Sequence, residues 1–166
     1  MINICCCTGH RPKGFPFKYG VNKPKHKAYL QMLEEKIKLA ITDYGITCFV
    51  SGMALGVDLD FAEIVLNFKD TEYKNITLEC AIPCPNQTAQ WTGEDKLRYD
   101  KILQRADDIT LVSNHYDRDC MLKRNRYMVD KSQLVIAVFN GIERGGTFYT
   151  IKYARAKNKA IELIVL

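Results

Sequence analysis

The chain has 166 residues, a length typical of one domain and sufficient to bury a hydrophobic core without disulfides or metals. Apolar residues make up 47% of the sequence and charged residues 26%, which excludes a disordered or fibrous chain. The net charge is +5, and the stretch from Arg11 to Lys27 contains six cations, while the first acid of the chain is Glu34. Such a stretch favours a phosphate-bearing partner, small or polymeric, although a solvated lysine-rich loop would look the same.

The sequence predicts a reduced, cytoplasmic protein without membrane contact. No apolar run approaches the roughly 20 residues that span a bilayer, and residues 1–8 lack the basic segment and cleavage site of a secretory signal. Three of the seven cysteines are consecutive, at residues 5–7, and adjacent strand residues point to opposite faces. We therefore expect the cysteines to serve as small apolar residues, with Cys80, Cys84 and Cys120 the more accessible thiols.

Apolar patterns along the chain predict an alternation of strands and helices. A short apolar run begins the chain, and the next segment shows helical spacing, with Leu30, Leu33 and Tyr44 on one face and a Glu34–Lys38 pair on the other. In chain order, the predicted strands are residues 2–8, 46–51, 76–82, 109–113, 134–139 and 161–166. The predicted helices are about residues 24–44, 54–68, 92–106, 120–131 and 147–158, with Thr92 as a capping residue.

The alternation predicts parallel βαβ units. Residues 134–139 are apolar at every position, as in a strand that helices cover on both faces. The sequence thus predicts one domain over residues 1–166, a Rossmann-like, doubly wound, three-layer α/β/α fold with a mainly parallel sheet of about six strands. In such a sheet, ligands bind beyond the carboxyl ends of the strands, where the strand order reverses.

Three loops at that edge carry unusual chemistry. After the first strand, Gly9 permits a tight turn, and Thr8, His10 and Arg11 offer hydrogen-bond donors, with Arg11 able to grip a phosphate or carboxylate through two parallel bonds. After the fifth strand, two glycines allow a ligand to approach the backbone, and a threonine follows that can cap a helix or bind phosphate; these are Gly145, Gly146 and Thr147.

The loop after the second strand reads Ser51-Gly52-Met53-Ala54-Leu55-Gly56-Val57-Asp58. Its glycines expose amides at a helix start, which is a ready site for an anion. Asp58 either bonds a ribose hydroxyl or sits in the first helical turn to suit the helix dipole; we favour the second role. The motif is neither the dinucleotide fingerprint nor a P-loop.

The helix at 120–131 has a polar residue on its apolar side. Met121, Met128 and Val129 define the inward face, and Asn125 falls on it. A buried amide needs partners, so Asn125 either ties down a loop or reads the polar edge of a ligand. The histidines are scattered and the cysteines lack metal-ligand spacing, so we expect no metal site.

Together these loops resemble the SLOG superfamily, the Rossmann-like group of the Smf/DprA and LOG proteins. Ser51 to Asp58 is similar to the S-G-x-A-x-G-x-D element of DprA-type members. The small YpsA-like branch is resembled by two further features. One is the segment from Thr8 to Pro12, and the other is the series Arg124-Asn125, Val129-Asp130 and Gly145-Gly146-Thr147. The resemblance implies a ligand site formed by Thr8, Gly9, His10, Arg11, Ser51, Gly52, Met53, Ala54, Gly56, Asp58, Arg124, Asn125, Gly145, Gly146 and Thr147.

The resemblance implies binding or sensing of a nucleotide or a nucleotide-derived, ADP-ribose-like ligand, with no cofactor required. Whether the protein is an enzyme stays open, because Thr150 stands where LOG phosphoribohydrolases carry a glutamate. One alternative is a nucleoside-monophosphate N-glycosidase that uses another acid, Asp58 or Asp130. A second is DprA-like binding of single-stranded nucleic acid, in which Phe15, Phe17 and Tyr19 stack on bases. The ligand and a homodimer or higher homo-oligomer also stay open.

Overall fold

A computed structural model describes residues 3–166, and residue 2 of the first predicted strand lies outside them. In chain order the elements are β1 (Ile4–Thr8), the short 3-10 helix η1 (Pro12–Gly14), α1 (Pro24–Thr42), β2 (Cys48–Ser51), α2 (Val57–Thr71), β3 (Thr77–Ile82), α3 (Gly93–Arg105), β4 (Asp108–Leu111), α4 (Cys120–Lys131), β5 (Leu134–Phe139), α5 (Gly145–Ala156) and β6 (Ala160–Val165). None of the helices in this part of the chain combines the length and apolar character needed to cross a membrane.

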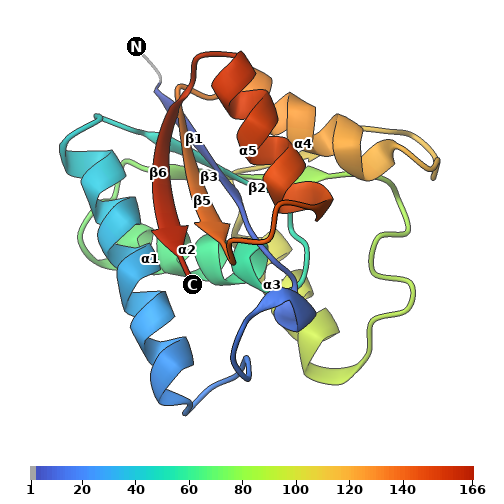
Figure 1. The fold of residues 1–166 in the computed structure, drawn as a ribbon, viewed down its shortest axis with the longest axis horizontal. Coiled ribbons are helices and arrows are strands. Elements are labelled where there is room, and N and C mark those ends of the chain that lie inside the picture. Colours follow the sequence, from blue (N-terminus) through green and yellow to red (C-terminus); the bar gives the residue numbers. More distant parts are fainter. Residues whose placement is uncertain (1–2) are drawn as a thin grey trace.

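The six strands form one parallel sheet in the order β4-β3-β2-β1-β5-β6 (Figure 1). The chain runs outward from β1 to β4 and then crosses back to place β5 on the other side of β1. The strand order therefore reverses between β1 and β5, and a crevice is expected at their carboxyl ends. The predicted Rossmann-like α/β class is confirmed.

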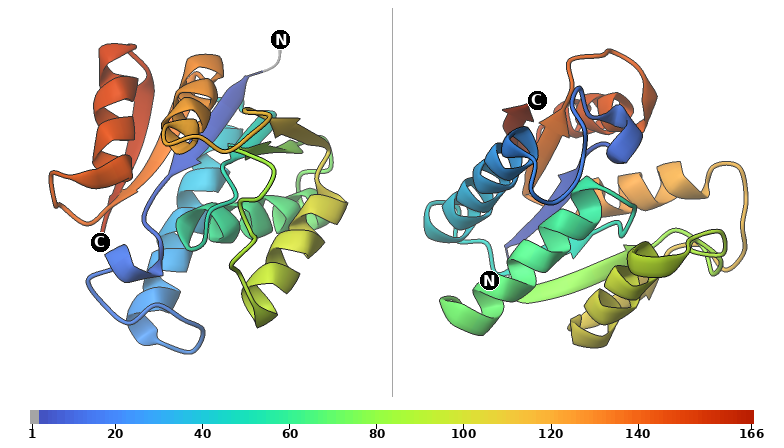
Figure 2. Two further views of the ribbon diagram at one scale, coloured as in Figure 1. Left: turned by 90° about the vertical axis from the view of Figure 1, so that its right-hand side faces the viewer. Right: turned by 90° about the horizontal axis from the view of Figure 1, so that it is seen from below.

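Helices cover both faces of the sheet (Figure 2). The first three helices, α1, α2 and α3, lie on one face, and α4 and α5 pack together on the other. The consecutive cysteines show the two cores: Cys5 and Cys7 join the core under α1–α3, while Cys6 joins the core under α4 and α5. All three are fully buried, as predicted for small apolar residues of a central strand.

Two local predictions on α1 are wrong. Tyr44 is exposed, because the helix ends at Thr42, two residues before the predicted boundary. Lys38 does not pair with Glu34; its Nζ lies 3.4 Å from Glu72, the residue that follows α2. The packing of α1 near the end of α2 therefore determines the partner of Lys38, and the residue spacing within one helix carries no information about that packing.

The predicted accessibility of the thiols is also wrong. Cys80, Cys84 and Cys120 are all buried, and Cys48 is instead the one cysteine of the chain that is only half-buried. Cys84 and Cys120 are neighbours, so the segment after β3 and the start of α4 bury each other's thiol. Position in a loop thus did not imply exposure.

Candidate functional site

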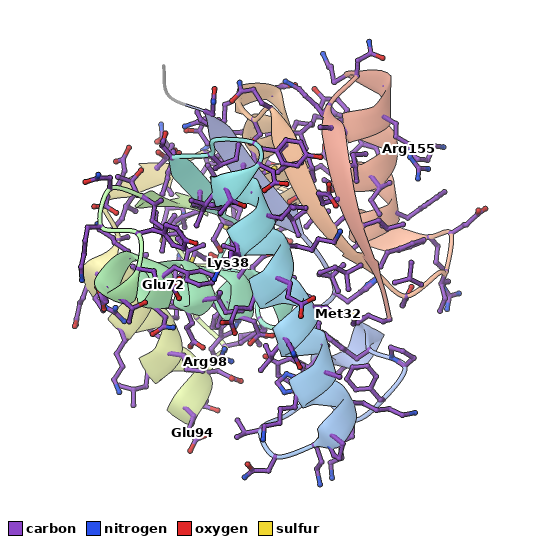
Figure 3. The ribbon with its side chains drawn as sticks, turned by 90° about the vertical axis from the view of Figure 1, so that its left-hand side faces the viewer. Met32, Lys38, Glu72, Glu94, Arg98 and Arg155 are labelled. Atoms are coloured by element: carbon purple, nitrogen blue, oxygen red, sulfur yellow. The ribbon has the colours of Figure 1, made fainter. Side chains whose placement is uncertain are left out.

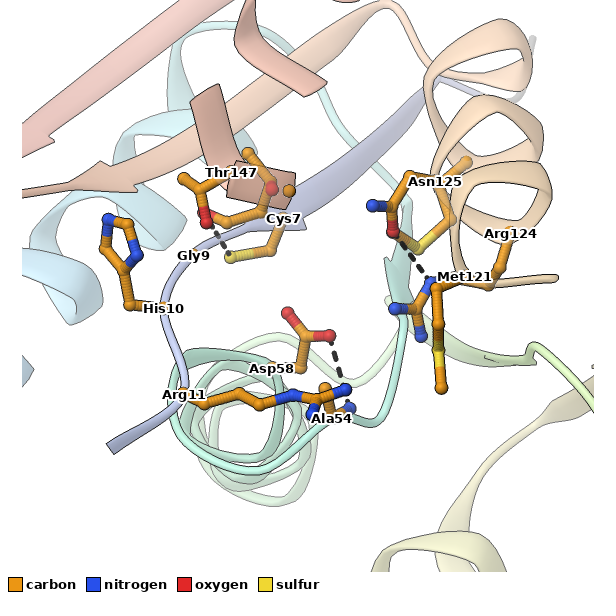
Figure 4. A pocket seen from close by; sticks show the side chains of 13 residues that line it. Cys7, Gly9, His10, Arg11, Ala54, Asp58, Met121, Arg124, Asn125 and Thr147 are labelled. Carbon is orange, nitrogen blue, oxygen red and sulfur yellow. Dashed lines mark hydrogen bonds between the residues drawn. The ribbon is translucent and has the colours of Figure 1, made fainter. Parts of the chain in front are cut away.

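A cavity of about 270 Å³ opens at the carboxyl ends of β1 and β5, where the strand order reverses (Figure 4). The loop after β1 contributes Cys7, Thr8, Gly9, His10 and Arg11 to its wall. The start of α2 and the loop before it add Ala54 and Asp58. The opposite wall consists of Met121, Arg124, Asn125 and Met128 from α4, and Gly146 and Thr147 from α5.

The cavity brings together ten of the fifteen predicted site residues. The other five, Ser51, Gly52, Met53, Gly56 and Gly145, are not part of its wall. Three wall residues were not among the predicted site residues: Cys7, Met121 and Met128. The signals for them were present, because Cys7 ends a central strand and both methionines belong to the predicted inward face of α4.

The loop after β1 is held in place by packing and by His10. A Cβ atom on Gly9 would lie 2.5 Å from the side chain of Val57, so only glycine fits against α2 there. The Nε2 atom of His10 accepts a hydrogen bond from the backbone N–H of Asn140 at 3.1 Å, which ties this loop to the one after β5. Partial burial lowers the pKa of His10, so the imidazole is neutral and serves as an acceptor.

The loop after β2 shapes the cavity from behind. The Ser51 hydroxyl donates to the backbone carbonyl of Asp58 at 2.8 Å and accepts the N–H of Met53 at 3.2 Å. Gly56 has φ +90°, and a Cβ there would overlap the carbonyl oxygen of His10. Asp58 accepts the N–H of Ala54 at 3.2 Å. These bonds fold residues 51–58 into a compact turn that presents the Asp58 carboxyl to the cavity.

Arg124 is the residue that the sequence pattern misjudged. The sequence pattern predicts Asn125 on the inward face of α4, but Arg124 is the buried residue, only 4% exposed, and Asn125 is half-buried. The Arg124 guanidinium donates to the carbonyl of Gly52 through Nη1 and to Asn125 Oδ1 through Nε at 2.8 Å. A Cβ on Gly52 would lie 2.5 Å from that Nη1. The absence of a side chain at Gly52 therefore leaves the room that the Arg124 guanidinium occupies.

Charge in the cavity is unbalanced toward the positive. Figure 4 shows the Asp58 carboxyl with Arg11 below it and Arg124 to its right. Burial raises the pKa of Asp58, and Arg124, the Ala54 N–H and Arg11 partly oppose this rise. Burial likewise lowers the pKa of Arg124, and the negative charge of Asp58 raises it. An arginine nevertheless stays protonated at neutral pH. Two guanidinium groups thus face one carboxyl, which suits an incoming anion.

The start of α5 is open toward the cavity. A Cβ on Gly146 would meet no atom within 4 Å. Free backbone N–H groups at a helix N-terminus attract anions, and here they border the same space as the two arginines. Thr150, by contrast, is buried and bonded to the carbonyl of Gly146 at 2.8 Å, and Asp130 accepts a bond from Tyr153 at 2.8 Å. Neither of these residues is part of the cavity wall.

Comparisons with known proteins find a matching family model and several relatives. Residues 5–165 match a family model named YpsA and described as "YspA SLOG family". The chain is 26% identical over 162 residues to a UPF0398 protein of Halalkalibacterium halodurans, covering 95% of this chain and 83% of the relative. It is 24% identical over 163 residues to a UPF0398 protein of Bacillus cereus, covering 95% and 85%. Neither relative is named for a ligand or an activity.

Proposed function

The chain belongs to the YspA SLOG family, and from that premise we propose that it binds a nucleotide or a nucleotide-derived, ADP-ribose-like ligand through the ligand's phosphate. The observation that carries the proposal is that Arg11 and Arg124 line the same cavity as the open start of α5. Their guanidinium groups and the N–H groups near Gly146 face one cavity from three different elements.

Arg124 supplies a fixed charge to this site. Its guanidinium is buried and held by Gly52 and Asn125, so it loses little freedom when an anion arrives. Arg11 is exposed at the rim and can close over a bound phosphate. A rigid cation at the floor and a free one at the rim together suit a ligand that enters phosphate first.

Hydrolysis of a nucleoside monophosphate is the second candidate, and Asp58 favours it. Among residues 3–166, Asp58 is the carboxyl in the cavity wall, and burial raises its pKa, which is the direction that a general acid needs. Thr150 and Asp130 do not reach the cavity, so Asp58 is the acid on which such chemistry would depend. Incubation with nucleoside monophosphates, followed by chromatography for released free base, tests this candidate.

Nucleic-acid binding by base stacking is less well supported. Phe15 is buried and packs against Phe17, Tyr19 and Tyr29, with ring centroids 5.0–5.5 Å apart. These rings pack against one another in edge-on and tilted arrangements, so they are engaged with each other rather than with bases. Contact with a polymer would depend on the lysines of the same stretch and on charge alone.

We expect Arg11→Ala to weaken binding of ADP-ribose and AMP by at least about tenfold, because a charge-assisted hydrogen-bond pair is lost. Isothermal titration calorimetry measures this, and thermal melts check that the fold is intact. Lys13→Ala is the matched control, since it removes a nearby exposed cation that is not part of this cavity. Equal affinities of the parent and Arg11→Ala would contradict the proposal.

A further inference from the structure

We propose that a second cavity, between α1, α2 and α3, binds a linear organic polycation, an aliphatic chain with two or more ammonium groups. The cavity has a volume of about 600 Å³ and shares no wall residue with the site described above. Figure 3 views the molecule from this side and labels Glu94 and Arg98, which enter the cavity wall from α3.

The charge of this cavity is opposite to that of the whole chain. Five carboxyl groups line it, and the accompanying cation is Arg98; the acids are Glu34, Asp60, Glu63, Glu94 and Asp95. Five carboxylates against one guanidinium give a formal charge of −4, in a chain whose net charge is +5. A small polycation is therefore attracted to this cavity although the net charge of the chain is positive.

The single cation satisfies only part of this charge. Arg98 pairs with Asp60 at 2.9 Å and with Glu63 at 2.7 Å. Asp60, only 4% exposed, also accepts bonds from the hydroxyls of Tyr19 at 2.8 Å and Tyr29 at 2.9 Å. Three of the five cavity acids have no ion-pair partner among the described residues: Glu34, Glu94 and Asp95.

His26 provides an independent sign that a hydrogen-bond partner is missing. Its ring borders the cavity, is only 4% exposed, and lies 4.4 Å from the ring of Tyr19 and 5.5 Å from that of Tyr29. Its Nε2 atom is buried without a hydrogen-bond partner. Burial lowers the pKa of His26, so the imidazole is neutral and can accept a bond. An ammonium group supplies the donor that this nitrogen lacks.

The geometry favours an extended ligand over a metal ion. Among residues 3–166, no three His, Cys, Asp or Glu side chains are close enough to hold one metal ion, so the acids here are spread rather than convergent. The same wall includes the apolar side chains of Val21, Leu30 and Ile64. Spaced carboxylates with apolar surface between them match ammonium groups separated by methylenes.

The test is calorimetric titration of the full chain with spermidine, a triamine, at low salt. We expect one site, and binding at least about tenfold weaker in the double variant Glu34→Gln/Asp95→Asn. The matched control is Glu35→Gln/Asp100→Asn, which removes two acids of the same helices that do not line the cavity, the exposed Glu35 and the half-buried Asp100 that pairs with Lys96. His26→Phe keeps a ring between the tyrosines and is also expected to weaken binding.

Thermal melts of each variant show whether the fold is retained. Absence of spermidine binding, equal loss in the control variant, or equally tight binding of Mg²⁺ would overturn the proposal. Arg11→Ala is expected to leave spermidine binding unchanged, so this result and that for the nucleotide site are read separately.

Discussion

Gly52 and Gly56 act by leaving room for other groups. Gly52 leaves space for the Arg124 guanidinium, and Gly56 lets α2 begin directly against the carbonyl of His10. Gly56 also has φ +90°, a conformation that L side chains rarely adopt. A larger side chain at Gly56, as in Gly56→Val, is therefore expected to destabilise the fold itself and not only to disturb the ligand site.

Gly56→Ala should lower the free energy of unfolding by at least about 2 kcal/mol, from backbone strain and overlap with His10. Gly146→Ala should leave it unchanged or slightly higher, because a Cβ there meets no atom within 4 Å. Gly146→Ala should nevertheless weaken nucleotide binding, since the new methyl group lies at the start of α5 beside the cavity. Urea unfolding and calorimetry measure the two effects; a stable Gly56→Ala variant would refute the packing argument.

At the scale of elements, the edge of the sheet is fixed by a buried carboxylate. Glu79 on β3 accepts hydrogen bonds from Lys131 and Tyr127 of α4 and from Thr110 of β4. Burial alone would raise the pKa of Glu79, but these bonds outweigh burial and its pKa lies below the ordinary value. One carboxyl therefore joins three elements.

The depressed pKa of Glu79 predicts a pH dependence of stability. A carboxyl whose pKa is lower in the folded state stabilises the fold above its unfolded pKa of about 4.3, and this stability is lost as the pH falls through the folded pKa. Glu79→Gln should be less stable than the parent at pH 7, with the difference shrinking below about pH 4. Urea unfolding between pH 3 and 7 measures it, with Glu35→Gln on exposed α1 as control. A difference that does not change with pH would contradict the assignment.

Thiol labelling tests the burial of the strands. Cys48 at the start of β2 is half-buried, while the other six cysteines are buried. A thiol reagent should therefore modify Cys48 first in the native protein, although burial raises the pKa of its thiol and slows the reaction. Cys48→Ser should abolish this first phase, and denaturant should expose all remaining thiols. Earlier labelling of Cys84 or Cys120 would show that their segments open readily.

The elements differ in how far the sequence could predict them. The bounds of β5 and α4 agree with prediction, because one is a continuous apolar run and the other a clear helical pattern. The start of α2 lies three residues later than predicted, at Val57, since the side chain of Asp58 closes a turn over residues 54–58. Arg124 was missed as a buried residue because its burial depends on Gly52, 72 positions away in the chain.

At the scale of the whole molecule, charge is separated into regions of opposite sign. The stretch from Arg11 to Lys27 is free of acids, and the cavity at β1 and β5 faces two arginines. The cavity between α1, α2 and α3 is acidic, although Tyr19 of the basic stretch forms part of its wall. A net charge of +5 thus describes neither site, and each is expected to select its ligand by local charge.

This separation of charge limits how strongly a nucleic acid can bind to the chain. The acid-free stretch offers single-stranded DNA at most six cations, and the aromatic rings Phe15, Phe17 and Tyr19 within it pack against the core. We expect weak binding whose logarithmic affinity falls with the logarithm of salt concentration at about −0.7 per neutralised phosphate, hence no more steeply than about −4 in total.

Fluorescence anisotropy of a labelled oligonucleotide across a salt series measures the slope of this line. The double variant Lys18→Gln/Lys23→Gln should make the slope of the salt dependence shallower. It should leave ADP-ribose binding unchanged, because neither lysine lines the cavity at β1 and β5. Tight binding that persists at high salt would require base stacking, which the packed Phe15, Phe17 and Tyr19 rings do not offer, and would place the nucleic-acid function first.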